Sequence, residues 1–381
     1  MTKANNSLLM KEMNRKKILS LIRKKAQSRA DIARSTGLSR AAVSIIADDL
    51  IKDGLIVEGE TVKSETGRRP TMLSICPDAY ISIGIDLSRT GCNISYIDFA
   101  SKVVFKSYVA LCESADLTIL KVCQSVRAEL SERFPSKKVL GIGVCCPGPI
   151  DAEMGVILNP PGLEMFHNFG IVDSITSHLG LSVFLEKDTN ALAISEKNAG
   201  KFEGDIVYLL ADHGIGCGVV KDGKLFGAKG GMGCEIGHVT LKFDGERCRC
   251  GNVGCAELYA SIPAILKIAA DTFGESIDWG TLVEMAEKDI RVANDLMQRY
   301  ADMLSTVCVG AVNLFEPDYI VLGGELKYAE GILAPLIEQR IASSCLSRAK
   351  RNVRVIGTAF GDNARAYAAA ELVIENYFVG E

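Results

Sequence analysis

Apolar residues recur at helical spacing along the first fifty residues, and polar breaks divide them into three short segments. The first segment, residues 14–25, carries isoleucine and leucine on one face and predicts a helix. Ser28 and Asp31 have the spacing of a capping box, which predicts a second helix through residue 33. Two short amphipathic helices are therefore expected near the start of the chain.

A third helix is predicted from Ser39, which can cap it, to Gly54, after a tight turn at Gly37. Its apolar face, expected to pack inward, consists of Val43, Ile46 and Leu50. Ala41, Ser44 and Ile45 are expected to point outward, with Arg40 at the exposed N-terminal end, and the candidate DNA contacts are Ser39, Arg40, Ala41 and Ser44. Three helices with a tight turn before the third form a helix-turn-helix pattern, whose last helix presents its first residues to base edges of DNA. The alternative is a helical docking domain with a solvated basic face.

Residues 55–57 and 71–75 predict a two-stranded wing after the third helix, with Arg68 and Arg69 at its tip. Both arginines suit phosphates or the minor groove. Residues 1–76 carry 15 Lys and Arg against 8 Asp and Glu, a net charge of +7, whereas the rest of the chain carries 28 against 39, or −11. A basic head on an acidic body indicates that residues 1–76 bind a polyanion, and we expect double-stranded DNA.

From Tyr80 onward, apolar strands alternate with amphipathic helices, which predicts an α/β body. Strands are expected at 81–85, 94–99, 103–109, 139–145, 183–185, 206–210, 216–221 and 319–322, and helices at 117–134, 190–198, 263–273, 281–287 and 293–314. A chain of 381 residues has enough length for two lobes besides the head. We expect lobe 1 at 77–192, completed by a C-terminal helix at 363–381, and lobe 2 at 193–362.

The sequence has no stretch of 18 or more apolar residues, and its first residues have no signal-peptide pattern. Most of the 13 cysteines lie in apolar segments, which is typical of small core residues in a reducing compartment. We therefore expect a cytoplasmic protein without a membrane partner.

The segment from Gly230 to Leu258 concentrates the candidate chemistry. It contains one imidazole and three thiols, at His238, Cys248, Cys250 and Cys255. A set of three cysteines and one histidine can hold a structural Zn²⁺ ion in a closed tetrahedron, although ordinary reduced cysteines are the alternative. Glu235 and Glu257 flank the set, and two carboxylates beside a metal centre indicate a site for a polyhydroxylated ligand.

Three turns are typical of phosphate binding. The first follows the strand end at Asp86 and includes Thr90, the second contains Gly214 and Gly216, and the third is the pair Gly323 and Gly324. Each turn alone also fits a purely structural role. Their order along one α/β chain is the stronger indication.

Together these motifs resemble those of the ROK family, whose members are sugar kinases and sugar-responsive transcriptional repressors on a two-lobed, actin/hexokinase-like (ribonuclease H-like) α/β fold. The matching segments are GRRP, GIDL, VCCPGPID, EKDTN, GCEIGH, CRCGNVGC and LGGEL. Members that carry a winged helix ahead of this body resemble repressors rather than simple kinases.

The resemblance implies a role for each matched residue. The zinc ligands would be His238, Cys248, Cys250 and Cys255, and the contacts to sugar hydroxyls would include Glu235, His238 and Glu257. One ring nitrogen of His238 would bind zinc while the other faces the sugar. Asp188 matches the carboxylate that accepts a proton from the attacking sugar hydroxyl in kinase members, whereas its residue type and position alone indicate a helix cap.

Several departures weaken the match to a kinase. The family's Gly-Gly-Thr turn is Ser88-Arg89-Thr90 here, and His213 stands where the second turn usually has threonine or serine. Side chains at positions 88 and 89 crowd an approach that glycines leave open to phosphate. Asp86, which would hold magnesium, is retained, so Mg-ATP is expected only if the chain is an active kinase.

The pair Lys187-Asp188 replaces the family's Asn-Asp. An ammonium cannot accept a hydrogen bond from a sugar hydroxyl as an asparagine can. Two interpretations stay open. Lys187 pairs with Asp188 and lowers its basicity, or Lys187 binds the carboxylate or phosphate of a charged sugar derivative.

We therefore expect a sugar-responsive repressor that binds a palindromic DNA operator as a homodimer, with pairing into tetramers left open. The effector would be a monosaccharide or derivative held by Lys187, Asp188, Glu235, His238 and Glu257. Its binding would shift operator affinity. The alternatives are an ATP-dependent sugar kinase, with Asp188 as its catalytic residue, and a regulator controlled by contact with a transport protein.

Overall fold

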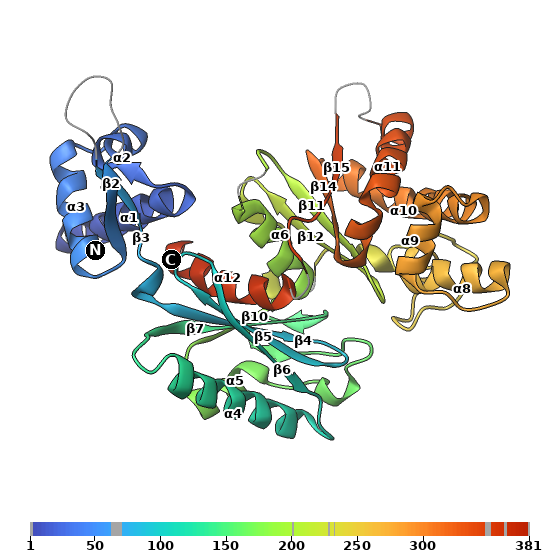
Figure 1. Ribbon diagram of the computed structural model, residues 1–381, viewed down its shortest axis with the longest axis horizontal. Coiled ribbons are helices and arrows are strands. Elements are labelled where there is room, and N and C mark those ends of the chain that lie inside the picture. The colour runs from blue at the N-terminus through green and yellow to red at the C-terminus, as the bar shows by residue number, and fades with distance from the viewer. Residues whose placement is uncertain are drawn as a thin grey trace. The chain divides into compact units, whose positions relative to one another are not determined.

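The computed structural model describes residues 3–61, 71–199, 202–227, 229–231, 233–346, 352–361 and 364–379 (Figure 1). The chain forms two compact units. Unit 1 contains Met1–Cys145, Ile171–Leu185 and Ala369–Glu381, and unit 2 contains Cys146–Gly170 and Glu186–Ala368. Among the residues described, no helix combines the length and the apolar character that crossing a membrane requires.

Unit 1 begins with a head of three helices and a small sheet. The helices are α1 (Lys3–Lys24), α2 (Arg29–Thr36) and α3 (Arg40–Lys52). The strands β1 (Gln27–Ser28), β2 (Ile56–Thr61) and β3 (Thr71–Ile75) form an antiparallel sheet in the order β1-β3-β2. All three helices were predicted, but α1 starts eleven residues before the expected position 14, and β1 was not expected.

The local signals of the head act as the sequence indicates. Ser28 and Asp31 form a complete capping box at the start of α2, and Gly37 ends that helix in the left-handed conformation with φ of 74°. The Oγ of Ser39 accepts a hydrogen bond of 3.2 Å from the backbone N–H of Ala42 and caps α3. The inward face of α3 is confirmed, because Val43, Ile46 and Leu50 are buried. Arg68 and Arg69 lie outside the described residues.

The first five-stranded sheet has the order β10-β7-β4-β5-β6. Its strands are β4 (Ile81–Leu87), β5 (Gly91–Asp98), β6 (Val103–Ala110), β7 (Val139–Cys146) and β10 (Val183–Lys187). The strands β4, β5 and β6 form an antiparallel meander, and β7 runs parallel to β4. A short 3-10 helix, η1 (Pro77–Ala79), precedes the sheet.

Helices cover both faces of this sheet. α4 (Ala115–Arg133) and α5 (Ile171–Leu179) lie together on one face, and α12 (Ala364–Val379) crosses the other (Figure 1). The backbone of α12 approaches the sheet closely at Gly143, where an added Cβ would lie 1.8 Å from the carbonyl oxygen of Ala369. Glycine is therefore required at position 143 by packing.

Unit 2 contains a second five-stranded sheet, in the order β13-β12-β11-β14-β15. Its strands are β11 (Ile206–Ala211), β12 (Ile215–Lys221), β13 (Lys224–Leu225), β14 (Tyr319–Gly323) and β15 (Arg354–Gly357). Here too a three-stranded meander is followed by a parallel strand beside its first strand. The two sheets thus share one strand order, which is the repeated ribonuclease H-like arrangement expected of the body.

One face of the second sheet packs on α6 (Asp188–Asn198). Alternate β11 residues on the opposite face, Val207, Leu209 and Ala211, join a large apolar core with the helices that follow. Those helices are α7 (Glu257–Ala260), α8 (Ile262–Phe273), α9 (Trp279–Glu287), α10 (Arg291–Phe315) and α11 (Glu330–Ser344), with the short η5 (Gly324–Ala329). The remaining short elements of the unit are β8 (Ile150–Asp151), β9 (Val156–Ile157), η2 (Glu164–Phe166), η3 (Lys229–Gly231) and η4 (Ile236–His238).

The division into units differs from the expected boundaries. The head and most of lobe 1 form one unit, whereas residues 146–170 and 186–192 belong to unit 2. Packing explains the first of these segments, because an added Cβ on Gly231 would meet Ile150 Cγ1 at 2.4 Å. The strand β8 in this segment therefore packs against η3.

Candidate metal centre and ligand site

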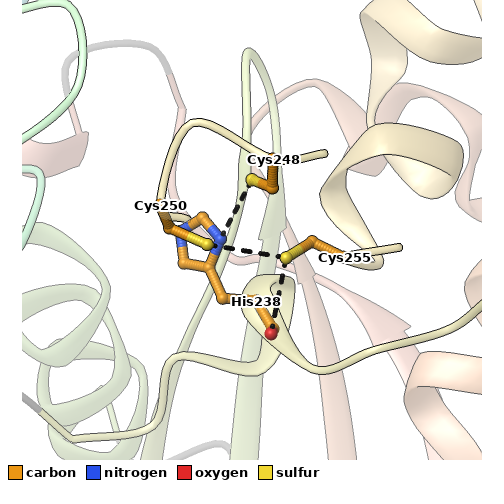
Figure 2. A group of neighbouring side chains, drawn as sticks. All are labelled: His238, Cys248, Cys250 and Cys255. Carbon is orange, nitrogen blue, oxygen red and sulfur yellow. Dashed lines mark hydrogen bonds between the residues drawn. The ribbon is translucent and has the colours of Figure 1, made fainter. Parts of the chain in front are cut away.

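The imidazole and the three thiols predicted as a metal set come together in unit 2 (Figure 2). One ligand atom from each of His238, Cys248, Cys250 and Cys255 lies within 4.8 Å of the others. The Sγ of Cys248 is 3.7 Å from Nδ1 of His238, and the Sγ atoms of Cys250 and Cys255 are 3.6 Å apart. Nδ1 is therefore the ring nitrogen that faces the thiols.

A narrow loop brings these side chains together. Backbone bridges join Thr240 to Cys255 and Arg247 to Val253, so the loop folds back on itself between the ligands. The backbone N–H of Cys248 donates to the carbonyl of Asn252 at 2.8 Å. Gly254 has φ of 67°, and a Cβ there would lie 1.6 Å from the carbonyl oxygen of Lys242. Only glycine fits that position.

The donor set fits zinc. Tetrahedral zinc with Zn–S bonds of about 2.3 Å separates its donors by about 3.8 Å. The two donor pairs at 3.6 and 3.7 Å agree with that edge length. Three thiols and an imidazole are also the donor types that zinc prefers in closed structural sites.

Glu235 and Glu257 lie on opposite sides of the metal cluster in the sequence. Glu235 directly precedes η4, the short helix that ends in His238. Glu257 starts α7, two residues after Cys255, and its Oε2 accepts a hydrogen bond of 3.3 Å from the backbone N–H of Ile215. The turn at Gly214 makes this contact possible, because a Cβ there would lie 2.4 Å from Glu257 Oε2.

Asp188 is the first residue of α6 and is 7% exposed. Its Oδ1 accepts a hydrogen bond of 2.7 Å from the backbone N–H of Thr189. The Thr189 hydroxyl donates to the carbonyl of Cys217 on β12, and Gly216 leaves room for its methyl group. Gly216, which the sequence predicted to lie at a phosphate-binding turn, thus helps to position the start of α6 and with it Asp188.

Arg365, in the first turn of α12, lies between two carboxylates of unit 2. Its Nε is 3.5 Å from Asp188 Oδ2, and its Nη2 binds Asp212 Oδ2. Burial raises the pKa of Asp188 above its ordinary value, while the Arg365 charge acts in the opposite direction. Sequence reasoning missed Arg365, which no short motif marks, and gave no role to Asp212, although Asp212 begins the segment that contains the turn at Gly214.

Lys187 is buried, with 3% of its side chain exposed, and binds Glu235 rather than Asp188. Its Nζ donates to Glu235 Oε1 at 3.0 Å and to the carbonyl of Gly233 at 2.7 Å. The ion pair of Lys187 is thus with Glu235 and not with the adjacent Asp188, but the lysine charge still lowers the pKa of Asp188, as that interpretation expected. The true partner lies 48 residues away, and only the fold brings it close.

Comparison with known proteins places these residues in a family. The ROK family profile matches residues 82–376, which is most of the chain. The chain belongs to the ROK family. This ROK chain is 27% identical over 390 residues to the xylose repressor of Caldicellulosiruptor bescii, covering 97% of this chain and 98% of that protein.

Two solved structures differ in how much of this chain they match. A ROK family transcriptional regulator, described as a homologue of the E. coli MLC protein, superposes with a TM-score of 0.83 at 24% identity and covers 97% of this chain and 98% of its own. The ROK hexokinase of Thermus thermophilus has a TM-score of 0.66 at 26% identity and covers 78% of this chain and 99% of its own. The body of the chain therefore has the fold of ROK sugar kinases.

The residues matched to nucleotide contacts in ROK kinases are divided between the two units. Asp86 and Thr90 belong to unit 1, and Gly214, Gly216, Gly323 and Gly324 belong to unit 2. The first turn is closed by its own side chain, because Ser88 Oγ donates to the carbonyl of Gly91 at 2.8 Å. In unit 2, a Cβ on Gly324 would lie 2.3 Å from Asp212 Oδ1, so this glycine allows a tight packing contact.

The candidate DNA contacts gather at the start of α3 in the ROK chain's head. Ser39, Arg40 and Ala41 are exposed, and Ser44 is half-buried. Ile45, which the sequence also predicted to point outward, is 60% exposed. The start of α3 is thus open to a partner.

Proposed function

We propose that this ROK protein is a sugar-responsive, DNA-binding transcriptional repressor. The main support for the proposal is how much of the chain each kind of relative matches. The xylose repressor matches 97% of it, head included, whereas the hexokinase structure covers 78% of it while using 99% of its own length. The sugar-kinase body alone does not account for the basic head.

The head is proposed to be a winged helix that reads a palindromic operator. α3 would enter the major groove with Ser39, Arg40, Ala41 and Ser44 toward the bases, since they lie at its open N-terminal end. Arg68 and Arg69 would contact the DNA backbone or minor groove from the wing. A homodimer would match the two-fold symmetry of such an operator.

The ligand site is proposed to take a monosaccharide or derivative. Asp188, Glu235 and Glu257 supply carboxylate oxygens, each able to accept hydrogen bonds from hydroxyl groups. Zinc would be held by Nδ1 of His238 and the thiolates of Cys248, Cys250 and Cys255. The bound ion would fix the orientation of the His238 ring, which leaves Nε2 for the ligand.

Sugar kinase activity is the alternative, and two observations weigh against it. Ser88 and Arg89 place side chains in the first turn where glycines would admit phosphate. Arg365 is held beside Asp188, the carboxylate that a kinase would need as its base.

Two experiments test the proposal together. Selection from a random double-stranded DNA library should enrich a palindrome, and a thermal-shift panel of neutral monosaccharides should raise the midpoint for at least one of them. A sugar response that does not change with Mg-ATP supports a regulator. A sugar response that grows with Mg-ATP, with no enriched DNA sequence, would establish a kinase instead.

A further inference from the structure

Lys187 is a buried residue of the candidate ligand site, where its ammonium binds Glu235. A Cβ on Gly148 would lie 3.0 Å from Lys187 Cδ and 3.3 Å from Glu235 Oε1, so the absence of a side chain at position 148 leaves room for this pair. The Lys187 side chain is 3% exposed, whereas the Glu235 side chain is 35% exposed. The carboxylate therefore forms the accessible part of the pair, and the lysine supports it.

The ion pair with Glu235 neutralises the positive charge of Lys187 inside the protein. A buried ammonium needs a counter-ion, and leaving one without its partner is strongly destabilising. Glu235 supplies that charge, and the carbonyl of Gly233 takes a second N–H. Within the residues that the structure describes, these two acceptors account for two of the three N–H groups of the ammonium.

The charge balance around the site disfavours an anionic ligand. Its carboxylates are Asp188, Asp212, Glu235 and Glu257, and its cations are Lys187 and Arg365. Both cations are already paired with carboxylates. A sugar acid or sugar phosphate would therefore meet an excess of negative charge, in spite of the lysine.

We propose that Lys187 is a specificity-determining residue that makes the site select an uncharged ligand with a hydroxyl group at the Glu235 position. A hydroxyl suits this arrangement because it donates a hydrogen bond to the accessible carboxylate of Glu235, whose charge and orientation the buried lysine fixes. A deoxy ligand lacks that donor, and a carboxylate repels Glu235. This inference rests on the proposed ligand-binding function and names the class of ligand.

A double-mutant cycle on thermal stability tests the ion pair without any ligand. The variants are Lys187→Met, Glu235→Gln and the double variant, each measured as a zinc-loaded full chain. We expect the midpoint loss of the double variant to be smaller than the sum of the two single losses, because removing both charges leaves neither one buried alone. Lys288→Met is the matched control, since it removes a lysine from the exposed pair with Glu284. Additive losses would overturn the proposal.

A second experiment measures ligand binding. Dissociation constants are determined for D-glucose, D-xylose and N-acetylglucosamine, and for those of their deoxy, uronic acid and phosphate derivatives that are stable compounds. Wild type should bind a neutral sugar and not its acid, and Lys187→Met should weaken that binding roughly tenfold to a hundredfold. Glu235→Gln leaves an unneutralised ammonium at the site, so it should gain affinity for the acid. Tighter binding of an acid or phosphate by wild type overturns the proposal.

The two arms separate the possible failures. If the stability cycle shows coupling but no sugar in the panel binds wild type, the sugar-binding function fails and the hydroxyl selection fails with it. If a neutral sugar binds equally well to wild type and to Lys187→Met, the function stands and the role of Lys187 is wrong.

Discussion

At the scale of single residues, Asp188 shows a conflict between stability and ligand binding. Its carboxylate is buried at the start of α6, and burial raises its pKa in spite of the nearby Arg365 charge. The folded protein thus holds the Asp188 proton more tightly than the unfolded chain does. Stability from this group is present at low pH and is lost as pH rises from the unfolded pKa through the raised folded pKa.

Asp188→Asn is therefore expected to raise the thermal midpoint at pH 7, because it keeps the shape of the neutral carboxyl and removes the buried charge. The gain should shrink as pH falls through the folded pKa, where wild type is protonated as well. Midpoints of both proteins across pH 3.5 to 8 check this. A variant that is less stable than wild type at neutral pH would contradict the desolvation argument.

Asp278 provides a control of opposite sign. It caps α9 by accepting a hydrogen bond from the backbone N–H of Thr281, and that bond lowers its pKa. Its contribution to stability is present above the unfolded pKa and is lost as pH falls through the lowered folded pKa. Asp278→Asn should therefore lower the midpoint at pH 7 and approach wild type in acid.

At the scale of elements, the loop that carries Cys248 and Cys250 is expected to depend on a bound metal ion, because it has little apolar core of its own. Phe243 is 88% exposed, Val239 is 56% exposed and Val253 is 37% exposed, so burial of these side chains contributes little to the fold of the loop. A metal ion bound by the four ligands would therefore be the main cross-link between η4, this loop and the start of α7.

Cys255→Ser is expected to abolish stoichiometric zinc and to lower the thermal midpoint, since Cys255 is fully buried and a hydroxyl is a poor zinc ligand. Metal analysis of the purified chain should give one zinc ion for wild type. Cys308→Ser is the matched control, because Cys308 is equally buried in α10 but lies outside the cluster. If wild type contains no zinc, the assignment of the four ligands fails.

Sequence reasoning succeeded where the signal is local. Caps at Ser28 and Ser39 sit beside the backbone groups they satisfy, so α2 and α3 were predicted from their own residues. α11 was not predicted, because Pro335 lies inside it and breaks the usual helical pattern. β1 was missed because a strand of two residues has no period to detect.

The candidate site shows the same limit at longer range. The metal ligands fall within eighteen residues and were found as a motif, and the structure brings them together. The partners of the site's charged groups come from distant segments. Glu235 reaches Lys187 across 48 residues, and Asp212 meets Arg365 across 153. Nothing in the neighbouring sequence specifies such pairs, because they depend on how the sheets and α12 are stacked.

At the scale of the whole molecule, α12 belongs to both compact units. It is one uninterrupted helix whose first residues fall in unit 2 and whose later residues fall in unit 1. The first turn carries Arg365 beside Asp188, within the candidate ligand site. The later turns carry Glu371, Glu375 and Phe378, and all three contact Arg23 of α1 in the head.

These contacts join α1 of the head to the later turns of α12. Arg23 Nη1 donates to Glu375 Oε2 at 2.8 Å, Nη2 binds Glu371, and the guanidinium lies 4.8 Å from the centre of the Phe378 ring. A sugar bound at Asp188, as proposed, would compete with Arg365 in the first turn of the same helix. If sugar binding alters operator affinity through α12, the Arg23 contacts must carry part of that effect.

Arg23→Met should therefore leave sugar affinity close to wild type and reduce the ratio of operator affinities measured with and without sugar. Couplings of about 1–3 kcal/mol correspond to ratios of about 5–150, and loss of the contact should move the ratio toward one. Fluorescence anisotropy on the selected DNA, at saturating and zero sugar, gives this ratio directly. Lys11→Met is the control, since it removes an equal charge from α1 but breaks an exposed pair with Asp49 inside the head. Because a lost charge weakens DNA binding in both conditions, it cancels in the ratio. An unchanged ratio in Arg23→Met would mean that the signal reaches the head by a route other than α12.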